Sequence, residues 1–285
     1  MMLFNVQKKF SGNKAVSPAI STVIMMGAMI AILSVTVVFA NDFLWSSVAE
    51  GDFNSSKQLM HTVGLQIDDV AWTMGRTETI GYASQYGEVV FNPLALNYTI
   101  TIDRDGVLPS YVISRVTGAV MFNFPTSRYN IKDGYWENIS PTQNGYLTLK
   151  GTSAPVARVF AVEKVPMVDG SYIRVVVAPA VRVLNSSITT SDSTTNYVRM
   201  YLPILSVGET PRLSKSITLT GESLDARTIS DVIGINVTVS FQDGSDFDSA
   251  FFNFPFDSEN VSLPSGDVVL ELYLSEVSVG FGINY

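Results

Sequence analysis

Hydrophobic positions follow three successive patterns along this chain of 285 residues. From residue 19 to residue 40 no side chain is charged. Between residues 41 and 75 apolar side chains return at steps of three and four, which is the spacing of one face of an α-helix. After residue 76 short runs alternate between apolar and polar side chains, with the period of two that β-strands have. The patterns predict one long N-terminal helix followed by a β-rich region.

The uncharged run is long enough to cross a membrane. Its 22 residues would rise about 33 Å as a helix, close to the roughly 30 Å of a hydrocarbon core. A cleaved secretion signal has about 7–15 apolar residues and an A-x-A-like end, whereas this longer run ends in Phe39-Ala40-Asn41. The sequence predicts a retained transmembrane helix over about 19–40, and a buried helix of a soluble core is the alternative.

Charged residues on the two sides of this run predict its orientation. Positive side chains precede it and negative ones follow it: Lys8, Lys9 and Lys14, then Asp42, Glu50 and Asp52. By the positive-inside rule the N-terminus stays in the cytoplasm and the rest of the chain faces outward. The net charge is -8, and the three lysines give the first fifteen residues +3, so the remainder carries -11. An acidic body of this kind is unsuited to binding nucleic acid.

The helical pattern continues past the membrane run as an amphipathic extension over 41–75. Its apolar stripe has the a and d spacing of a coiled coil and comprises Met60, Val63, Ile67, Val70 and Met74. The stripe serves either as a seam between helices or as a face that packs on the domain that follows. Gly75 predicts the helix end, because glycine readily adopts the left-handed conformation found there. Gly51 and Asp52 mark a place where the helix could bend or break.

Residues 76–285 predict a mainly antiparallel β-sandwich of ten or more strands, so the fold class is α+β. Runs rich in Val, Ile, Thr, Tyr and Phe cover 98–102, 110–116, 146–150, 172–178, 197–205, 216–220, 235–241 and 268–274. Turn dipeptides punctuate them: Asp105-Gly106, Asp133-Gly134, Asn144-Gly145, Asp169-Gly170 and Asp243-Gly244. The polar stretch 185–196 is either a link between two lobes or the tip of one long hairpin.

Composition leaves few routes to catalysis. The chain has no cysteine and one histidine, His61, which excludes a disulfide framework, a Cys-ligated zinc site and a thiol nucleophile. It contains no G-x-S-x-G, P-loop, G-x-G-x-x-G or H-E-x-x-H motif. We therefore expect neither an enzyme nor a bound cofactor. His61 reads as a surface or interface residue, and the neighbouring Asp68 and Asp69 read as part of a solvated helix face.

Two further sets of polar residues are candidates for binding or modification. Asp243, Asp246 and Asp248 lie in one loop and could offer oxygen ligands to Ca²⁺, although their spacing differs from that of an EF-hand. The N-x-[ST] triplet of N-glycosylation occurs six times, always on the C-terminal side of the apolar run, at Asn54, Asn97, Asn138, Asn185, Asn236 and Asn260. This one-sided distribution favours an exported, glycosylated body.

The residues KAVSP (14–18), followed directly by the apolar run, resemble the N-terminus of archaeal type IV pilins and pilin-like proteins. That family carries a class III, or prepilin-type, signal sequence, from which a prepilin peptidase removes a basic leader in front of the apolar helix. The resemblance places the processing site at Lys14, Ala15 and Val16, with the cut between Ala15 and Val16. It implies a leader over 1–15, an N-terminal helix over 16–75 and an extracellular domain over 76–285.

One position departs from the bacterial members of this class. The fifth residue of the processed chain would be Ile20, where bacterial type IV pilins usually have glutamate and many archaeal members have none. Pro18 would be the third residue and would cost no hydrogen bond in the first helical turn. The departure therefore weakens the comparison with bacterial pilins more than the one with archaeal proteins.

The resemblance implies a single-pass surface protein that is a structural subunit or minor component of a type IV pilus-like filament for adhesion or surface contact. Its partners would be membrane lipid, the prepilin peptidase and further copies of itself through the N-terminal helix. Small residues would let such helices approach closely, and the run has four: Gly27, Ala28, Ala31 and Ser34. The alternative is a non-polymerising anchored protein whose β domain binds a ligand or an envelope component.

Overall fold

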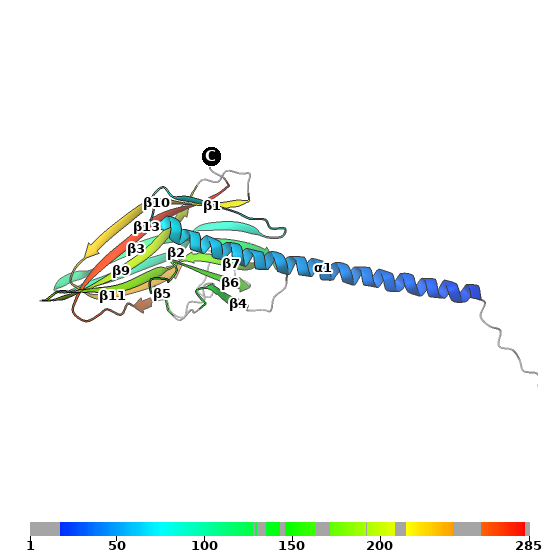
Figure 1. Ribbon diagram of the computed structural model, residues 1–285, viewed down its shortest axis with the longest axis horizontal. Helices are drawn as coiled ribbons and strands as arrows, with labels where there is room; N and C mark the ends of the chain where they lie inside the picture. The colour runs from blue at the N-terminus through cyan, green and yellow to red at the C-terminus, as the bar shows by residue number, and fades with distance from the viewer. Residues whose placement is uncertain are drawn as a thin grey trace, which may run out of the picture. The chain divides into compact units, whose positions relative to one another are not determined.

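The computed structural model describes residues 18–127, 129, 135–142, 146–163, 172–191, 193–208, 215–241 and 258–282 (Figure 1). The chain divides into two compact units, Met1–Val48 and Ala49–Tyr285. One helix, α1 (Pro18–Ala71), extends from the first unit into the second. The described strands all belong to the second unit, which we call the β body. The expectation of one long apolar N-terminal helix followed by a mostly β region is therefore confirmed.

Helix α1 is continuous over 54 residues, so the possible break at Gly51 and Asp52 does not occur. The chain leaves the helix after Ala71 and reaches Gly75 with a φ of 78°, in the left-handed region. The Gly75 amide then donates a hydrogen bond of 2.7 Å to the carbonyl of Gly221. Met74 is 69 % exposed. Its predicted place in the apolar stripe is wrong, because the helix has already ended.

The strands form two curled sheets (Figure 1). The six-stranded sheet has the order β1 (Thr77–Gly81), β10 (Ser216–Ile229), β13 (Asp267–Phe281), β9 (Thr194–Val207), β8 (Val181–Thr189), β5 (Thr148–Lys150). The seven-stranded sheet has the order β12 (Ser258–Asn260), β11 (Val232–Phe241), β2 (Glu88–Arg104), β3 (Val107–Pro125), β7 (Tyr172–Pro179), β6 (Ala157–Glu163), β4 (Trp136–Ser140). Among the described strands, two neighbouring pairs are parallel: β13 with β9, and β5 with β8. The other described pairs are antiparallel.

Each run that was predicted as a strand lies in a strand or overlaps one. The Asp105-Gly106 turn joins β2 to β3, and the other four predicted turn dipeptides lie outside the described residues. The polar stretch 185–196 lies at the end of the β8–β9 hairpin, where Thr189 is paired with Thr194. It therefore forms a hairpin tip, which is one of the two alternatives that the sequence left open.

Two groups of buried side chains stabilise the β body. One lies between the sheets and includes Ile100 and Ile102 of β2 and Leu272 of β13. The other combines the second part of α1 with residues of both sheets, and β7 contributes to both groups. Its Val176 belongs to the first group, whereas Val175 and its other odd-numbered neighbours belong to the second. Because successive side chains alternate across a strand, β7 is buried on both faces.

Along the six-stranded sheet, one face is buried against the other sheet at one end, and the opposite face is buried around α1 at the other end. In β13, Leu272 and Leu274 belong to the group between the sheets, whereas Val277 and Val279 belong to the group around α1. The neighbouring strand β10 has a bulge after Gly221, where its register with β13 shifts. Such an extra residue bends a strand and increases its twist. Leu274 and Val277 of β13 are three residues apart, so they point to opposite faces of that strand, which is why β13 contributes to both groups of buried side chains.

Candidate functional site

The first functional feature is the apolar surface of α1 within the first unit. Every described side chain from residue 20 to residue 48 is exposed, and the most apolar window of the helix has a mean hydropathy of 2.6 with none of it buried. Large apolar side chains that are exposed in this segment include Val23, Ile24, Met26, Ile32, Leu33, Val37 and Phe39. By length and composition this is one helix that could span a membrane. We call residues 20–48 the apolar segment.

Two hydroxyl side chains in the middle of the apolar segment suit a setting without water. The hydroxyl of Ser34 donates a 2.8 Å hydrogen bond to the carbonyl of Ile30, and that of Thr36 donates one of the same length to Ile32. In hydrocarbon an unsatisfied polar group costs several kcal/mol. Since both donors are satisfied inside the helix, these residues do not oppose insertion into lipid or into a bundle of apolar helices.

The second part of α1, residues 49–71, is part of the β body. Four members of its predicted stripe are fully buried there: Met60, Val63, Ile67 and Val70. The helix also approaches the seven-stranded sheet closely at Gly64, where an added Cβ would lie 2.7 Å from Cγ2 of Val159. The stripe therefore packs on the domain that follows, as one of the two sequence alternatives proposed. We call residues 49–71 the packed segment.

Ion pairs hold the packed segment to the sheets. Lys57 lies 3.0 Å from Oε2 of Glu137 on β4, and Asp68 lies 2.9 Å from Nη1 of Arg182 on β8. Burial by itself would raise the pKa of Glu137, but hydrogen bonds from Tyr135 and Lys57 outweigh it and lower the pKa. Asp68 also accepts a 2.7 Å hydrogen bond from Nε1 of Trp72. The reading of Asp68 as a purely solvated residue is therefore wrong.

An aspartate near the start of the packed segment binds the loop before β2. One oxygen of Asp52 accepts hydrogen bonds from the Ser84 hydroxyl at 2.9 Å and from the amides of Gln85 and Tyr86 at 3.1 Å. A carboxylate that satisfies several donors of one loop fixes the conformation of that loop. From the sequence alone, Asp52 was identified as a charge that follows the membrane run and as part of a possible helix break, and no local signal indicated its role in binding this loop.

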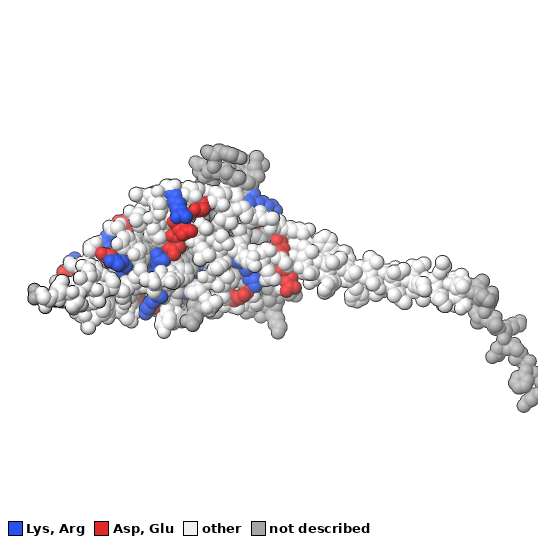
Figure 2. Space-filling model, in the orientation of Figure 1, with Lys and Arg blue, Asp and Glu red and all other residues white. Residues whose placement is uncertain are grey.

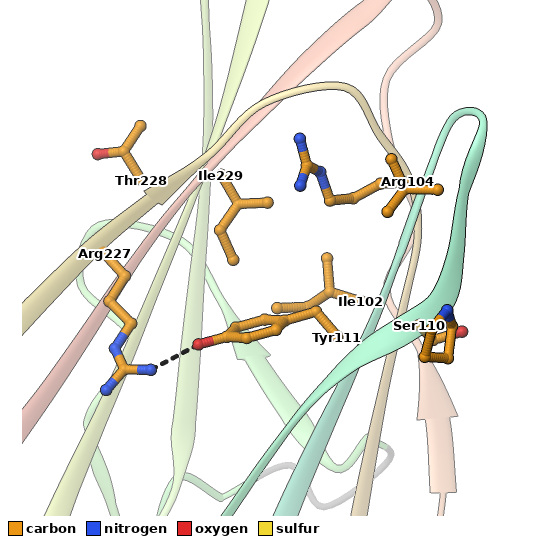
Figure 3. Close-up of a pocket in the computed structure, with 9 residues that line it drawn as sticks. Ile102, Arg104, Ser110, Tyr111, Arg227, Thr228 and Ile229 are labelled. Atoms are coloured by element: carbon orange, nitrogen blue, oxygen red, sulfur yellow. Dashed lines mark hydrogen bonds between the residues drawn. The ribbon is translucent and has the colours of Figure 1, made fainter.

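The second functional feature is a cleft of about 410 Å³ in the β body (Figure 3). It lies between the β2–β3 hairpin of one sheet and β10 of the other. Nη1 of Arg227 donates a 2.6 Å hydrogen bond to the hydroxyl of Tyr111, and Arg104 is the second arginine in the lining. Hydrogen bonds from Arg227 also lower the pKa of the nearby Asp225 carboxyl. No motif in the sequence indicated this cleft.

The distribution of charged side chains differs between the apolar segment and the β body. In Figure 2, blue and red side chains are scattered over the β body, whereas the apolar segment is white along its visible face. Within residues 20–48 the single charged residue is Asp42. The apolar segment therefore has the surface of a membrane or interface helix, while the β body has the mixed charge of a domain in water.

The predicted processing residues Lys14, Ala15 and Val16 lie outside the described residues, and so do Asp243, Asp246 and Asp248. Within the described parts of the chain, no group of three or more His, Asp or Glu side chains could hold a metal ion. His61 is half-buried on the packed segment. The processing site and the calcium hypothesis therefore remain predictions.

The six asparagines of the N-x-[ST] triplets are distributed over α1 and both sheets. Three of them are exposed: Asn54, Asn185 and Asn260. The other three are half-buried: Asn97, Asn138 and Asn236. The structure brings two of them together, since Nδ2 of Asn236 donates a 2.8 Å hydrogen bond to Oδ1 of Asn260. That amide nitrogen is the atom that glycosylation of Asn236 would modify.

Comparisons with protein-family models, with curated proteins and with solved structures gave no match for this chain.

Proposed function

We propose that this chain is a pilin-like surface protein, held in the cell membrane by α1 and serving as a subunit or minor component of a type IV pilus-like filament. The observation that carries the proposal is the division of one continuous helix into an exposed apolar segment and a packed segment. The KAVSP motif (14–18) directly before that helix adds the resemblance to a prepilin-type signal sequence. The leader stays in the cytoplasm, and the β body, in our interpretation a sandwich of two curled layers, lies outside.

The division of α1 also decides which surface is available for self-association. The stripe of the packed segment is buried against its own β body, so it cannot serve as a coiled-coil seam with another copy. Association between helices must therefore use the apolar segment, where Gly27, Ala28, Ala31 and Ser34 permit close approach. An added Cβ at Gly27 would meet nothing within 4 Å, so this position is unoccupied within the single chain.

The energetics of such a helix favour two settings over water. Exposed apolar surface costs about 25 cal/mol for each Å², so the apolar segment is stable in lipid or among identical segments. Transfer of the apolar segment out of lipid costs little free energy if the apolar segments of other copies cover the same side chains. A protein that passes from a membrane store into a filament requires this equivalence, and a segment with one charged residue over 20–48 provides it.

The most direct test of the proposed class is the N-terminus of the mature protein. Mass spectrometry of the protein from its own membranes should give a chain that begins at Val16. A matched variant, Ala15→Arg, should retain the leader, because the peptidase requires a small residue before the cut in the family that this motif resembles. A wild-type chain that still begins at Met1, or that is cut near Ala40, would remove the proposal.

The alternative, an anchored protein that does not polymerise, is distinguished by crosslinking. The chain has no cysteine, so a single Ala31→Cys variant reports only on contacts of the apolar segment. Oxidation of intact membranes or filaments should yield disulfide-linked dimers through this cysteine, and Gly27→Leu in the same chain should reduce their yield. If Ala31→Cys stays monomeric at native expression levels, the filament assignment fails and the non-polymerising anchor takes its place.

A further inference from the structure

The cleft between β10 and the β2–β3 hairpin has features of a small-ligand site (Figure 3). Its volume of about 410 Å³ lies within the range of about 300–1,000 Å³ that is usual for such sites. The two sheets are adjacent here without pairing, so the cleft opens at a junction that backbone hydrogen bonds do not close. Residues of the β body alone line it, so a ligand site here would not depend on filament assembly.

Arg104 provides a positive group whose terminal nitrogens are available. Its Nε donates a 3.1 Å hydrogen bond to the carbonyl of Ser230, which fixes the direction of the guanidinium. Among the described residues no carboxylate lies within ion-pair distance of Arg104, in contrast to Arg182, Arg199 and Arg227. In Figure 3 its guanidinium points into the cleft. An arginine held in this way can bind a carboxylate with two parallel hydrogen bonds.

Tyr111 provides a hydroxyl whose proton has a defined direction. Its oxygen accepts the 2.6 Å hydrogen bond from Arg227, so its own proton is free to point toward a ligand. Arg227 is itself paired with Asp225, with Nη2 and Oδ2 2.6 Å apart. Arg227 is therefore a positioning residue that orients Tyr111, and the net positive charge of the cleft comes from Arg104.

The remaining lining suits a compact ring with both apolar and polar faces. Ile102 and Ile229 provide apolar surface. The hydroxyl of Ser110 donates a hydrogen bond to Oδ1 of Asp103, and the side chain of Thr228 points away from the cleft (Figure 3). The Tyr111 hydroxyl and Arg104 are therefore the polar groups that would contact a ligand. The ring of Tyr111 lies along one wall (Figure 3). Aromatic and aliphatic walls can cover the C–H face of a sugar, while the Tyr111 hydroxyl and the Arg104 guanidinium bind its oxygens.

We infer that this cleft binds a sugar that carries a single carboxylate, such as a hexuronic acid. Arg104 binds the carboxylate, the Tyr111 hydroxyl donates to it, and the apolar walls cover the ring. The chain beyond its first fifteen residues is strongly acidic, which repels a polyanion and favours a ligand with one negative charge. The inference goes beyond membrane anchoring and does not rest on it.

The test uses the full-length protein in detergent micelles and isothermal titration calorimetry. Sodium glucuronate is the probe, methyl glucoside is the neutral sugar of the same shape, and N-acetylleucine is a carboxylate without a sugar ring. Glucuronate should bind, and methyl glucoside should bind at least about tenfold more weakly because it lacks the group that pairs with Arg104. Binding should also weaken as salt is added.

Variants show whether the cleft is responsible. Arg104→Gln should weaken glucuronate binding at least about tenfold, and Tyr111→Phe should weaken it less, since the ring remains. Arg199→Gln is the matched control: it removes the same charge from the outer face of β9 and should leave the affinity unchanged. Thermal unfolding of each variant shows whether it has folded, and the two cleft variants alter different parts of the site.

The results that overturn the inference are equally specific. Wild-type protein that binds no glucuronate, or Arg104→Gln that binds it as tightly as wild type, would rule out this site. Tighter binding of N-acetylleucine than of glucuronate would assign the cleft to another class of carboxylate. None of these results bears on the processed N-terminus or on crosslinking of the apolar segment, so the proposed function fails or stands by its own measurements.

Discussion

The apolar segment (20–48) and the packed segment (49–71) belong to one continuous helix, yet their apolar side chains are covered in different ways. In the packed segment a single stripe is buried by the two sheets, and the exposed side is polar except for Leu65. In the apolar segment side chains are apolar nearly all round, and the protein chain itself covers none of them. The comparison shows that two sequence patterns separate the two parts of the helix: apolar side chains at helical spacing mark the part that packs on a domain, and an uncharged, apolar run marks the part that the chain leaves exposed.

The same substitution should destabilise the β body when it is made in the packed segment and leave its stability unchanged when it is made in the apolar segment. Ile67→Ala empties a fully buried position and should lower the free energy of unfolding by about 2–5 kcal/mol. Ile32→Ala is the matched control in the apolar segment, where the side chain is 66 % exposed, and it should leave that free energy unchanged. Urea unfolding followed by near-UV circular dichroism in detergent measures both. Equal losses would mean that the two segments do not differ as described.

An added positive charge should impair membrane insertion when it is placed in the apolar segment and have no effect on insertion when it is placed in the packed segment. Leu33→Lys places an ammonium near the middle of the apolar segment and should disfavour membrane insertion by about 2.5–3.5 kcal/mol. Gln58→Lys, at an exposed position of the packed segment, should insert as well as wild type. The fraction of protein that resists alkaline extraction from membranes reports the difference. If Leu33→Lys is retained as fully as Gln58→Lys, the apolar segment is not the membrane anchor.

Two glycines of the packed segment should respond to alanine with opposite signs. At Gly64 an added Cβ would lie 2.7 Å from a side-chain carbon of Val159, so Gly64→Ala should destabilise the β body by about 1–3 kcal/mol. At Gly51 nothing lies within 4 Å of the added atom, so Gly51→Ala should stabilise the helix by up to about 1 kcal/mol. Thermal unfolding of the two variants checks the prediction, and a loss at both positions would contradict it.

The smallest expected effect concerns the ion pair of Lys57 with Glu137. Because the pKa of Glu137 is lowered in the folded protein, its stabilising effect is present above the unfolded pKa of about 4.3 and is lost as the pH falls through the folded pKa. Glu137→Gln should cost at most about 1 kcal/mol at pH 7, since the pair is partly exposed. The difference from wild type should begin to shrink as the pH falls below about 4.3 and should disappear once the pH is below the lowered pKa of Glu137 in the folded protein. A difference that stays constant from pH 7 to pH 3 would show that the charge has no role.

The sequence predicted the features of α1 and of the strands that depend on local pattern. Met60, Val63 and Ile67 are buried as their spacing indicated, and Gly75 lies just beyond the end of the helix. Met74 was placed wrongly because the spacing of apolar residues carries no information about the point at which the chain turns away. That point depends on Gly221, where an added Cβ would lie 2.3 Å from the carbonyl oxygen of Val70.

Contacts between distant parts of the chain could not be read from the sequence. The parallel pairing of β9 with β13 joins strands that start 73 residues apart, at Thr194 and Asp267. The cleft combines Arg104 with Arg227, which come from different sheets. A pattern with period two identifies a strand and its buried face, but it does not identify the neighbour of that strand. The candidate ligand site therefore had no sequence signal, whereas the candidate membrane segment had a strong one.

The most direct test of the central claim is the accessibility of two single cysteines in intact cells. The natural chain has no cysteine, so Met29→Cys in the apolar segment and Gln58→Cys in the packed segment can each be labelled with a membrane-impermeant maleimide without background. Gln58→Cys should react in intact cells, and Met29→Cys should react only after denaturation in sodium dodecyl sulfate, because lipid or neighbouring apolar segments cover it. Labelling of Met29→Cys in intact cells at the rate of Gln58→Cys would contradict the account.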